Sequence, residues 1–347
     1  MRRSWAEISL TRLEHNHAVI SRLVGGRPII AVVKADAYGH GIEAVAPRLV
    51  ACGVRTFGVA DLGEARLLRR HAEDAEIIVF GGCDEVDAPE FRALRLTASL
   101  YREDRIPEGL PLEIKIETGM GRLGIRPERL RPLLEQLEGR VSGVYSTLPC
   151  ADCDLEFTRE QIARFREATD GLSVRRHLAN SAALSIPEAR FDAVRPGLAL
   201  YGIANCPALS GLKPLLCWKS SVMAVNEHPP GAPIGYGASY RTSRASRIGI
   251  LGIGYADGYR RALSNRGQVL TEAGPAPVVG RISMDLTAID LTDLPSVGPG
   301  SQVVLLDSEP DSPVSAAALA ESLGTIPYEI LTTIGSRVER VYGTAWD

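Results

Sequence analysis

One lysine of the sequence has the setting of a reactive amine. Lys34 follows the apolar stretch Ala31-Val32-Val33, which has the composition of a buried β-strand. A lysine amine that is desolvated at the end of such a strand has a lowered pKa, and it becomes nucleophilic enough to form a Schiff base with an aldehyde cofactor. The alternative is an ordinary surface lysine at a strand end, so the surrounding elements have to decide between the two.

The first 205 residues alternate short β-branched apolar runs with amphipathic segments, which is the pattern of βα units around a parallel sheet. Eight runs predict an α/β fold with an N-terminal TIM (β/α)8 barrel. Such a barrel carries its catalytic groups at the C-terminal ends of the strands, where Lys34 stands. The runs cover residues 28–33, 56–60, 76–80, 96–100, 113–116, 141–145, 174–178 and 192–195.

Helical periodicity fills most of the gaps between these runs, for example over 42–52, 62–71, 129–137 and 158–169. The gap 101–112 is short and contains Pro107 and Pro111, so we expect no full helix there. From about Leu212 the pattern changes to short alternating strands separated by turns rich in Pro and Gly. We therefore predict a barrel over residues 11–211 and a C-terminal antiparallel β domain over 212–347.

The segment from Val32 to Gly41 resembles the cofactor-lysine motif of alanine racemases over ten consecutive positions, V-V-K-A-D-A-Y-G-H-G. The resemblance implies that Lys34 carries pyridoxal 5'-phosphate (PLP) and that Tyr38 lies beside this cofactor. The opening Trp5-Ala6-Glu7-Ile8 is also similar to the family's N-terminal segment. This implies that residues 1–10 contribute a strand to the C-terminal β domain.

Three further segments of the barrel region match the family in order: 115–124, 177–181 and 194–202. His177, taken alone, would more often be a core histidine with its hydrogen bonds satisfied, and that interpretation stays open. A guanidinium suits a carboxylate because its donors are fixed and permanently charged. A permanent cation at the pyridine nitrogen keeps that nitrogen unprotonated and so disfavours transamination. The resemblance implies Arg122 at the substrate carboxylate, Arg195 at the pyridine nitrogen, and Asn180, Ser181 and the amides of Gly197 and Leu198 at the cofactor phosphate.

Two segments of the second domain, Gly254-Tyr255-Ala256-Asp257-Gly258 and 280–285, match as well. Racemisation requires bases on both faces of Cα, and the resemblance implies Lys34 for the D-enantiomer and Tyr255 for the L-enantiomer. The amide of Met284 would lie near the substrate carboxylate. In the family the tyrosine arrives from the partner subunit, which implies a homodimer in which Tyr255 and Met284 complete the partner's site. The implied activity interconverts L-alanine and D-alanine and so supplies D-alanine for peptidoglycan.

The chain departs from the family pattern at three places. Thr147 stands where a histidine links the tyrosine base to the pyridine-side arginine, Ser336 replaces a phosphate-binding tyrosine, and the 101–112 crossover is short. These losses leave open a non-catalytic PLP-binding paralogue. A racemase of serine or another small amino acid also stays open, because the site residues named above do not separate these substrates from alanine. Lys115 occupies a position that some members carry as a carbamate, and an ordinary shielded lysine is an equal alternative.

The amino-acid composition limits the classes of binding partner and the cellular location that we expect for this chain. A formal net charge of -3 gives no basic face for nucleic acid or an anionic membrane, so we expect a small substrate. No apolar run approaches the length of a membrane span or of a secretory signal, so we expect a cytoplasmic protein. Six scattered cysteines are typical of reduced thiols, and Cys150 and Cys153 form one C-x-x-C without the second ligand pair that a zinc site needs. No metal is therefore expected.

Overall fold

The structure is a computed structural model that describes residues 2–137, 139–203 and 207–343. Cys206 and the outermost residues of the predicted domains, 1 and 344–347, lie outside the described residues. The chain forms two compact units, one of Thr11–Leu212 and the other of Met1–Leu10 together with Lys213–Asp347. We describe each unit by itself.

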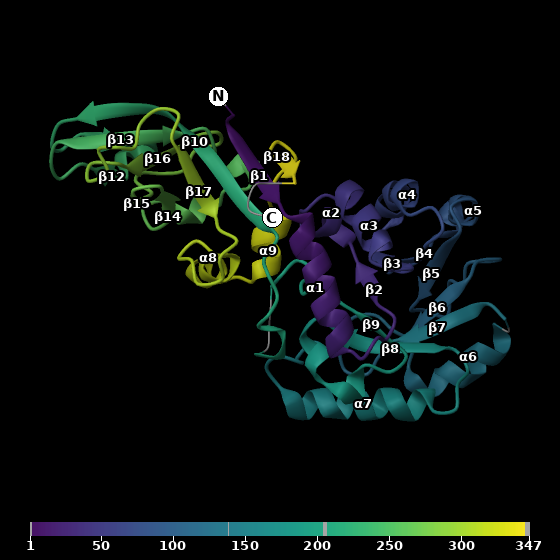
Figure 1. Ribbon diagram of the computed structural model, residues 1–347. Coiled ribbons are helices and arrows are strands. Elements are labelled where there is room, and N and C mark those ends of the chain that lie inside the picture. Colours follow the sequence, from purple (N-terminus) through teal and green to yellow (C-terminus); the bar gives the residue numbers. More distant parts are fainter. Residues whose placement is uncertain (1, 138, 204–206, 344–347) are drawn as a thin grey trace. The chain divides into compact units, whose positions relative to one another are not determined.

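The first unit is built on eight parallel strands that pair in sequence order, as Figure 1 shows. Its first and last strands also meet, because Val32 N donates to Pro196 O at 3.0 Å and Ile29 forms a parallel bridge with Val194. The sheet is therefore a nearly closed barrel, and the predicted barrel is confirmed. The strands are β2 (Ile30–Val32), β3 (Thr56–Val59), β4 (Glu76–Val79), β5 (Leu96–Leu100), β6 (Leu112–Lys115), β7 (Val141–Tyr145), β8 (Arg175–Asn180) and β9 (Ala193–Arg195).

Apolar runs become these strands because both faces of a parallel barrel sheet are covered. Every residue of β2, β5 and β9 is buried. Two of the helices between strands begin at polar caps: Asp61 accepts a hydrogen bond from Glu64 N ahead of α4 (Leu62–His71), and Asp154 accepts one from Phe157 N ahead of α7 (Leu155–Thr169). As expected, residues 101–111 form no helix. The helices are α1 (Leu10–Leu23), α2 (Lys34–Tyr38), α3 (Ile42–Ala51), α4 (Leu62–His71), α5 (Ala88–Ala93), α6 (Leu130–Gln136) and α7 (Leu155–Thr169).

The second unit is a mostly antiparallel eight-stranded sheet, accompanied by a two-stranded ribbon and two helices (Figure 1). The N-terminal strand β1 (Ser4–Ile8) lies inside this sheet, antiparallel to β10 (Leu216–His228) and parallel to β18 (Glu339–Tyr342). The predicted antiparallel β domain is thus confirmed, and the parallel pair and the helices are additions to it. The elements are β1 (Ser4–Ile8), β10 (Leu216–His228), β11 (Pro233–Ile234), β12 (Tyr240–Arg241), β13 (Ser246–Leu251), β14 (Gln268–Thr271), β15 (Gly274–Pro277), β16 (Thr287–Asp290), β17 (Gln302–Leu306), β18 (Glu339–Tyr342), α8 (Ala316–Leu323) and α9 (Pro327–Thr332).

Candidate active site

The backbone just after Lys34 has an unusual conformation. Residues 35–38 all have left-handed backbone angles, with φ between 51° and 55°. Each such non-glycine residue costs about 1–2 kcal/mol, so a run of four persists only where surrounding contacts enforce it. Here Ala37 N donates to Val33 O at 2.8 Å and Gly39 N donates to Ala35 O at 2.9 Å. Strain stored directly beside the candidate lysine favours a functional role for this turn.

Glu64, on α4, holds the turn from the outside. Its Oε1 accepts a hydrogen bond from Ala35 N at 2.6 Å, and its Oε2 accepts one from Ala60 N at 2.8 Å. Burial raises the pKa of Glu64, and these two hydrogen bonds oppose that effect. The sequence analysis missed Glu64, because its only signal is its place in the first turn of a helix that follows the neighbouring strand.

The barrel mouth gathers positive charge around Lys34. Burial and then the charge of Arg122 lower the pKa of Lys34, while Glu64 opposes them. Lys115 is buried at the end of β6, and burial followed by the charges of Arg122 and Arg195 lowers its pKa to about 8. A cationic mouth that contains an amine of lowered pKa suits an anionic ligand with an electrophilic carbon.

Tyr38 lies in a packed aromatic group at the same end of the barrel. Its ring stacks on Tyr201 with centroids 4.9 Å apart, and His40 stacks on Tyr201 at 4.6 Å. The Tyr201 hydroxyl donates to Val32 O at 3.1 Å. A Cβ atom on Gly197 would lie 2.4 Å from the Tyr38 hydroxyl oxygen, so glycine is required where the phenol approaches the backbone.

The segments after β8 and β9 meet through Ser181. Its Oγ accepts hydrogen bonds from Gly197 N at 2.9 Å and from Ala199 N at 3.2 Å. Asn180 donates to Leu148 O at 2.8 Å from the same region. The backbone amides of Gly197 and Ala199 thus converge on one oxygen atom, the Ser181 Oγ, and converging amides are the arrangement that binds oxyanions. The structure thus brings together Asn180, Ser181, Gly197 and the following Leu198, whose side chain is buried.

Arg195 is buried beside this cluster, and both of its terminal nitrogens donate to nearby acceptors. Nη1 donates to His177 Nδ1 at 2.7 Å, and Nη2 donates to Ser146 O at 2.5 Å. The guanidinium also lies over the Tyr145 ring, 5.0 Å from its centroid. Burial lowers the pKa of Arg195 to about 10. An arginine held this firmly presents a cation in a fixed place.

The bond from Arg195 also fixes the tautomer of His177. A guanidinium has no acceptor, so His177 Nδ1 must accept, and the ring proton sits on Nε2. That nitrogen lies 2.8 Å from Glu113 Oε2 and donates to it. Burial lowers the pKa of His177, which keeps the ring neutral. His177 is therefore a buried histidine with both nitrogens satisfied, and it also positions Arg195.

Glu113 extends this chain of contacts through the barrel interior. Arg175 donates to Glu113 at 2.6 Å and to Glu76 at 2.8 Å. Burial alone would raise the pKa of the fully buried Glu113, but His177 and Arg175 outweigh it and lower the pKa to about 2. The sequence analysis missed Glu113 and Arg175, since nothing in the sequence pairs residues 62 positions apart.

Thr147 does not take over the histidine's contact with Arg195. Its side chain is half-buried, and its carbonyl accepts a hydrogen bond from Gln161 at 3.3 Å. Within the described residues no hydrogen bond joins the Thr147 hydroxyl to the Arg195 guanidinium, which His177 and Ser146 hold instead. The Thr147 side chain therefore does not make the contact with Arg195 that the resemblance implies for a histidine at this position.

In the second unit the structure brings Tyr255 and Met284 together. Tyr255 N donates to Ser283 O at 3.0 Å, and Ala256 N donates to Met284 O at 3.1 Å. A Cβ on Gly254 would lie 2.3 Å from Met284 O, so the two turns are in backbone contact. Both side chains are exposed, Tyr255 by 43% and Met284 by 53%. Ser336 is exposed too, next to Gly335, which lines a hollow of about 440 Å³ beside Tyr255.

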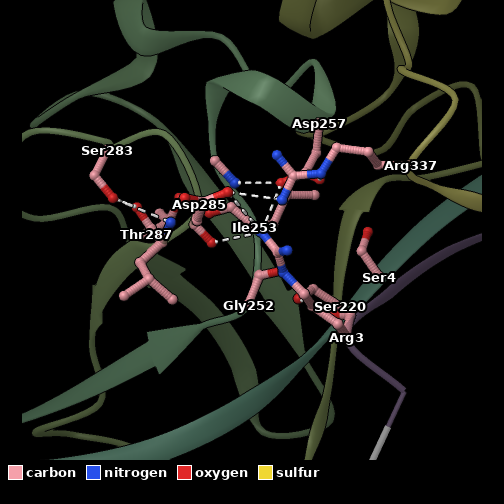
Figure 2. A network of polar contacts seen from close by, with 12 residues as sticks. Arg3, Ser4, Ser220, Gly252, Ile253, Asp257, Ser283, Asp285, Thr287 and Arg337 are labelled. Atoms are coloured by element: carbon pink, nitrogen blue, oxygen red, sulfur yellow. Dashed lines mark hydrogen bonds and ion pairs between the residues drawn. The ribbon is translucent and has the colours of Figure 1, made fainter.

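Figure 2 shows how two arginines brace these turns. Asp257 is buried and accepts hydrogen bonds from Gly254 N at 3.0 Å and from Arg3 at 3.1 Å, and it pairs with Arg337 at 3.3 Å. Arg337 also donates to Asp285 at 2.7 Å. The aspartates belong to the matched motifs, and Arg337 follows Ser336 in the segment that aligns with the family's S-Y-R-V-P-R, although no role was predicted for it. Arg3, near the other end of the chain, gave no signal.

Within residues 2–137, 139–203 and 207–343, no group of three or more His, Cys, Asp and Glu side chains could hold a metal ion. Across the same described ranges, no helix combines the length and apolar character that crossing a membrane requires.

Comparison with known proteins covers nearly the whole chain. Residues 8–205 match the family model described as alanine racemase, N-terminal domain, and residues 215–342 match alanine racemase, C-terminal domain. A relative named alanine racemase from Carboxydothermus hydrogenoformans is 38% identical, with 99% of this chain and 100% of the relative covered. One from Syntrophobacter fumaroxidans is 39% identical, with 96% of each chain covered.

Solved structures agree with these relatives. The biosynthetic alanine racemase from Pseudomonas aeruginosa has a TM-score of 0.90 and 34% identity, covering 99% of this chain and all of that one. The alanine racemase from Bartonella henselae with covalently bound pyridoxal phosphate has a TM-score of 0.89 and 29% identity over the same shares.

Proposed function

The chain belongs to the alanine racemase family of PLP-dependent isomerases, and we propose that Lys34 and Tyr255 are the two bases with which it interconverts L-alanine and D-alanine. The observation that carries the proposal is Lys34 on a strained turn at a cationic barrel mouth. Tyr255 stands on a braced and exposed turn of the other unit.

The residues of the barrel mouth fit PLP. The amine of Lys34 has a lowered pKa. Gly197 has no side chain, and the Tyr38 hydroxyl lies close to its backbone. We propose that Lys34 binds the aldehyde carbon and that Tyr38 packs beside the ring. Asn180, Ser181 and the amides of Gly197 and Leu198 would hold the phosphate, and Arg195 would face the pyridine nitrogen.

When bound, PLP supplies an electron-withdrawing ring that acidifies the Cα–H bond of an amino acid. Lys34 then moves the proton on the face of the D-enantiomer, and Tyr255 moves the proton on the opposite face. Arg122 and the amide of Met284 orient the substrate carboxylate, which keeps Cα between the two bases. Arg195 keeps the pyridine nitrogen unprotonated, because a guanidinium can donate a hydrogen bond but does not yield its proton at neutral pH.

The test of this function is the loss of optical rotation of L-alanine with purified protein and PLP. Lys34→Ala is the matched inactive control, and L-serine is the second substrate. Faster turnover of serine than of alanine would change the assigned substrate. No turnover of either, in protein that carries PLP, would favour a non-catalytic PLP-binding paralogue.

We also propose that the active form is a homodimer in which Tyr255 and Met284 complete the partner's site. The support is that the second unit exposes several large apolar side chains, and exposed apolar surface marks interaction sites. These side chains are Met223, Tyr236, Tyr255, Met284, Leu286 and Ile326.

Mixing two inactive variants tests this arrangement. Lys34→Ala and Tyr255→Phe chains, unfolded and refolded together, would form hybrids with one intact site each. Random pairing would then restore about a quarter of the wild-type activity, because half of the dimers are hybrids with one site in two intact. If one chain supplied both bases, mixing would restore nothing. The cytoplasmic location expected from the sequence remains a prediction.

A further inference from the structure

The C-x-x-C pair lies in the loop that joins strand β7 to helix α7, at the C-terminal end of the barrel strands (Figure 1). Cys150 is half-buried and Cys153 is exposed, and both are free thiols. Desolvation and then the neighbouring Cys150 side chain contribute to raising the pKa of Cys153. In the described ranges no further His, Cys, Asp or Glu completes a metal cluster around them. The pair is therefore a dithiol without the ligand set of a metal site.

The backbone between the two cysteines already has the shape that a disulfide needs. Cys153 N donates to Cys150 O at 3.1 Å, and Asp154 N donates to the same oxygen at 2.8 Å. A turn with the first of these hydrogen bonds holds its outer Cα atoms within about 7 Å. A disulfide spans roughly 4.4–6.8 Å between Cα atoms. Bond formation therefore requires side-chain rotation and little backbone movement.

The residues just before the pair hold three side chains of the barrel mouth by their carbonyl groups. Ser146 O accepts from Arg195, Thr147 O accepts from Gln161, and Leu148 O accepts from Asn180. Just after the pair, helix α7 begins behind the Asp154 cap. The turn 150–153 thus connects helix α7 to the segment whose carbonyl groups accept hydrogen bonds from Asn180 and Arg195, two residues proposed to hold the cofactor.

We propose that Cys150 and Cys153 form a reversible dithiol–disulfide site, oxidised by low-molecular-weight disulfides of the glutathione class, and that the closed disulfide stiffens the loop that holds Asn180 and Arg195. The part concerning Asn180 and Arg195 rests on the proposed function, whereas the disulfide itself does not.

The reaction balances as thiol–disulfide exchange. The exposed Cys153 sulfur, as thiolate, attacks one sulfur of oxidised glutathione and expels one glutathione thiolate. The Cys150 thiol then loses its proton to water and attacks the Cys153 sulfur, which expels the second glutathione. Two thiols are oxidised to one disulfide, and one glutathione disulfide is reduced to two thiols.

The other described cysteines lack this chemistry. Burial, followed by the charges of Asp87 and Asp84, raises the pKa of Cys83 to about 11. Burial raises the pKa of Cys217 to about 12. Desolvation, followed by the neighbouring Cys150 and Asp152 side chains, also raises the pKa of Cys153, so its oxidation should accelerate as pH rises. What distinguishes Cys153 from Cys83 and Cys217 is a second thiol within reach.

Peptide mapping of the full-length, PLP-loaded protein in glutathione buffers tests the site. The expected product is an internal 150–153 disulfide. It should form at a ratio of reduced to oxidised glutathione at least about tenfold higher than the ratio at which Cys52, Cys83 or Cys217 is modified. Cys150→Ser should instead trap glutathione on Cys153, and Cys83→Ser should leave the internal disulfide unchanged. A wild-type protein that keeps glutathione on Cys153 without closing the ring, or that shows no modification, would overturn the proposal.

The coupling to the barrel mouth has its own readout, which is the rate of PLP release into excess apo-acceptor protein. Oxidation should slow release from the wild type by roughly threefold or more, about 0.7 kcal/mol in the barrier. The same treatment should not change release from the Cys150→Ser/Cys153→Ser protein. A disulfide that forms without slowing release refutes the coupling, and failure to bind PLP at all would refute the proposed function instead.

Discussion

Glu113→Gln is a substitution for which the structure predicts a large loss of stability. Gln keeps the shape of the side chain and removes a charge that lies fully buried between His177 and Arg175. Arg175 retains its second partner, Glu76. The loss is therefore confined to one carboxylate and its two hydrogen bonds.

The magnitude follows from the pKa of the carboxyl group. A glutamate in an unfolded chain has a pKa of about 4.3, and in the folded protein the pKa of Glu113 is lowered to about 2. A difference of about two units corresponds to about 3 kcal/mol of stability at neutral pH. This agrees with the cost of about 3–5 kcal/mol for breaking a buried ion pair. For a unit of this size the melting temperature should fall by roughly 6–12 °C.

The pH dependence has a definite sign. The folded-state pKa of Glu113 is depressed, so its contribution is present above the unfolded pKa and is lost as pH falls through the folded pKa. The stability difference between wild type and Glu113→Gln should thus be constant above about pH 5 and shrink between about pH 4.3 and the folded pKa.

Urea unfolding followed by circular dichroism, repeated across this pH range, measures the effect. Glu76→Gln is the matched control, because Glu76 contacts the same arginine but is 29% exposed. We expect it to cost less than about 1 kcal/mol. A Glu113→Gln protein within about 0.5 kcal/mol of the wild type, or one whose deficit grows as the pH falls, would refute the reasoning.

Four further predictions concern the proposed site. Borohydride reduction of the PLP-loaded protein should label Lys34, and a label on Lys115, Lys213 or Lys219 would overturn the assignment. Tyr255→Phe should slow exchange of the Cα proton of L-alanine by about 10²-fold or more while PLP binding is unchanged, and equal exchange rates would exclude it as a base. Thr147→His should lower the pH at which L-alanine turnover rises and leave the D-alanine profile unchanged, because an imidazole polarises the tyrosine hydroxyl more than threonine does; superimposable profiles would contradict this. Lys115, with its pKa lowered to about 8 by burial and then by Arg122 and Arg195, should show a carbamate carbon signal with labelled bicarbonate that Lys115→Met loses, and equal signals would indicate a free amine.

The sequence was informative where local pattern determines structure. Continuous apolar runs and helical segments with a period of 3.6 residues predicted the barrel, because the burial of each strand and helix is visible in its own sequence. Lys34 could be placed at a strand end for the same reason. The left-handed turn after it could not be predicted, since a run of Ala, Asp and Tyr normally avoids that conformation.

What escaped prediction is the support around the chemical groups, and its cause is sequence distance. Arg3 is separated from Asp257 by 254 positions, and Glu113 from His177 by 64, so only the folded chain brings either pair together. In the barrel, buried Glu113 with Arg175 holds His177, which positions Arg195. In the second unit, buried Asp257 with Arg3 and Arg337 braces the turn that carries Tyr255, and the two arginines are 41% and 42% exposed. A buried carboxylate is costly to leave without its partners, so each network fixes its own part of the site. The short sequence motifs therefore indicate which residues react. The ion pairs between distant residues position those motifs in the folded chain.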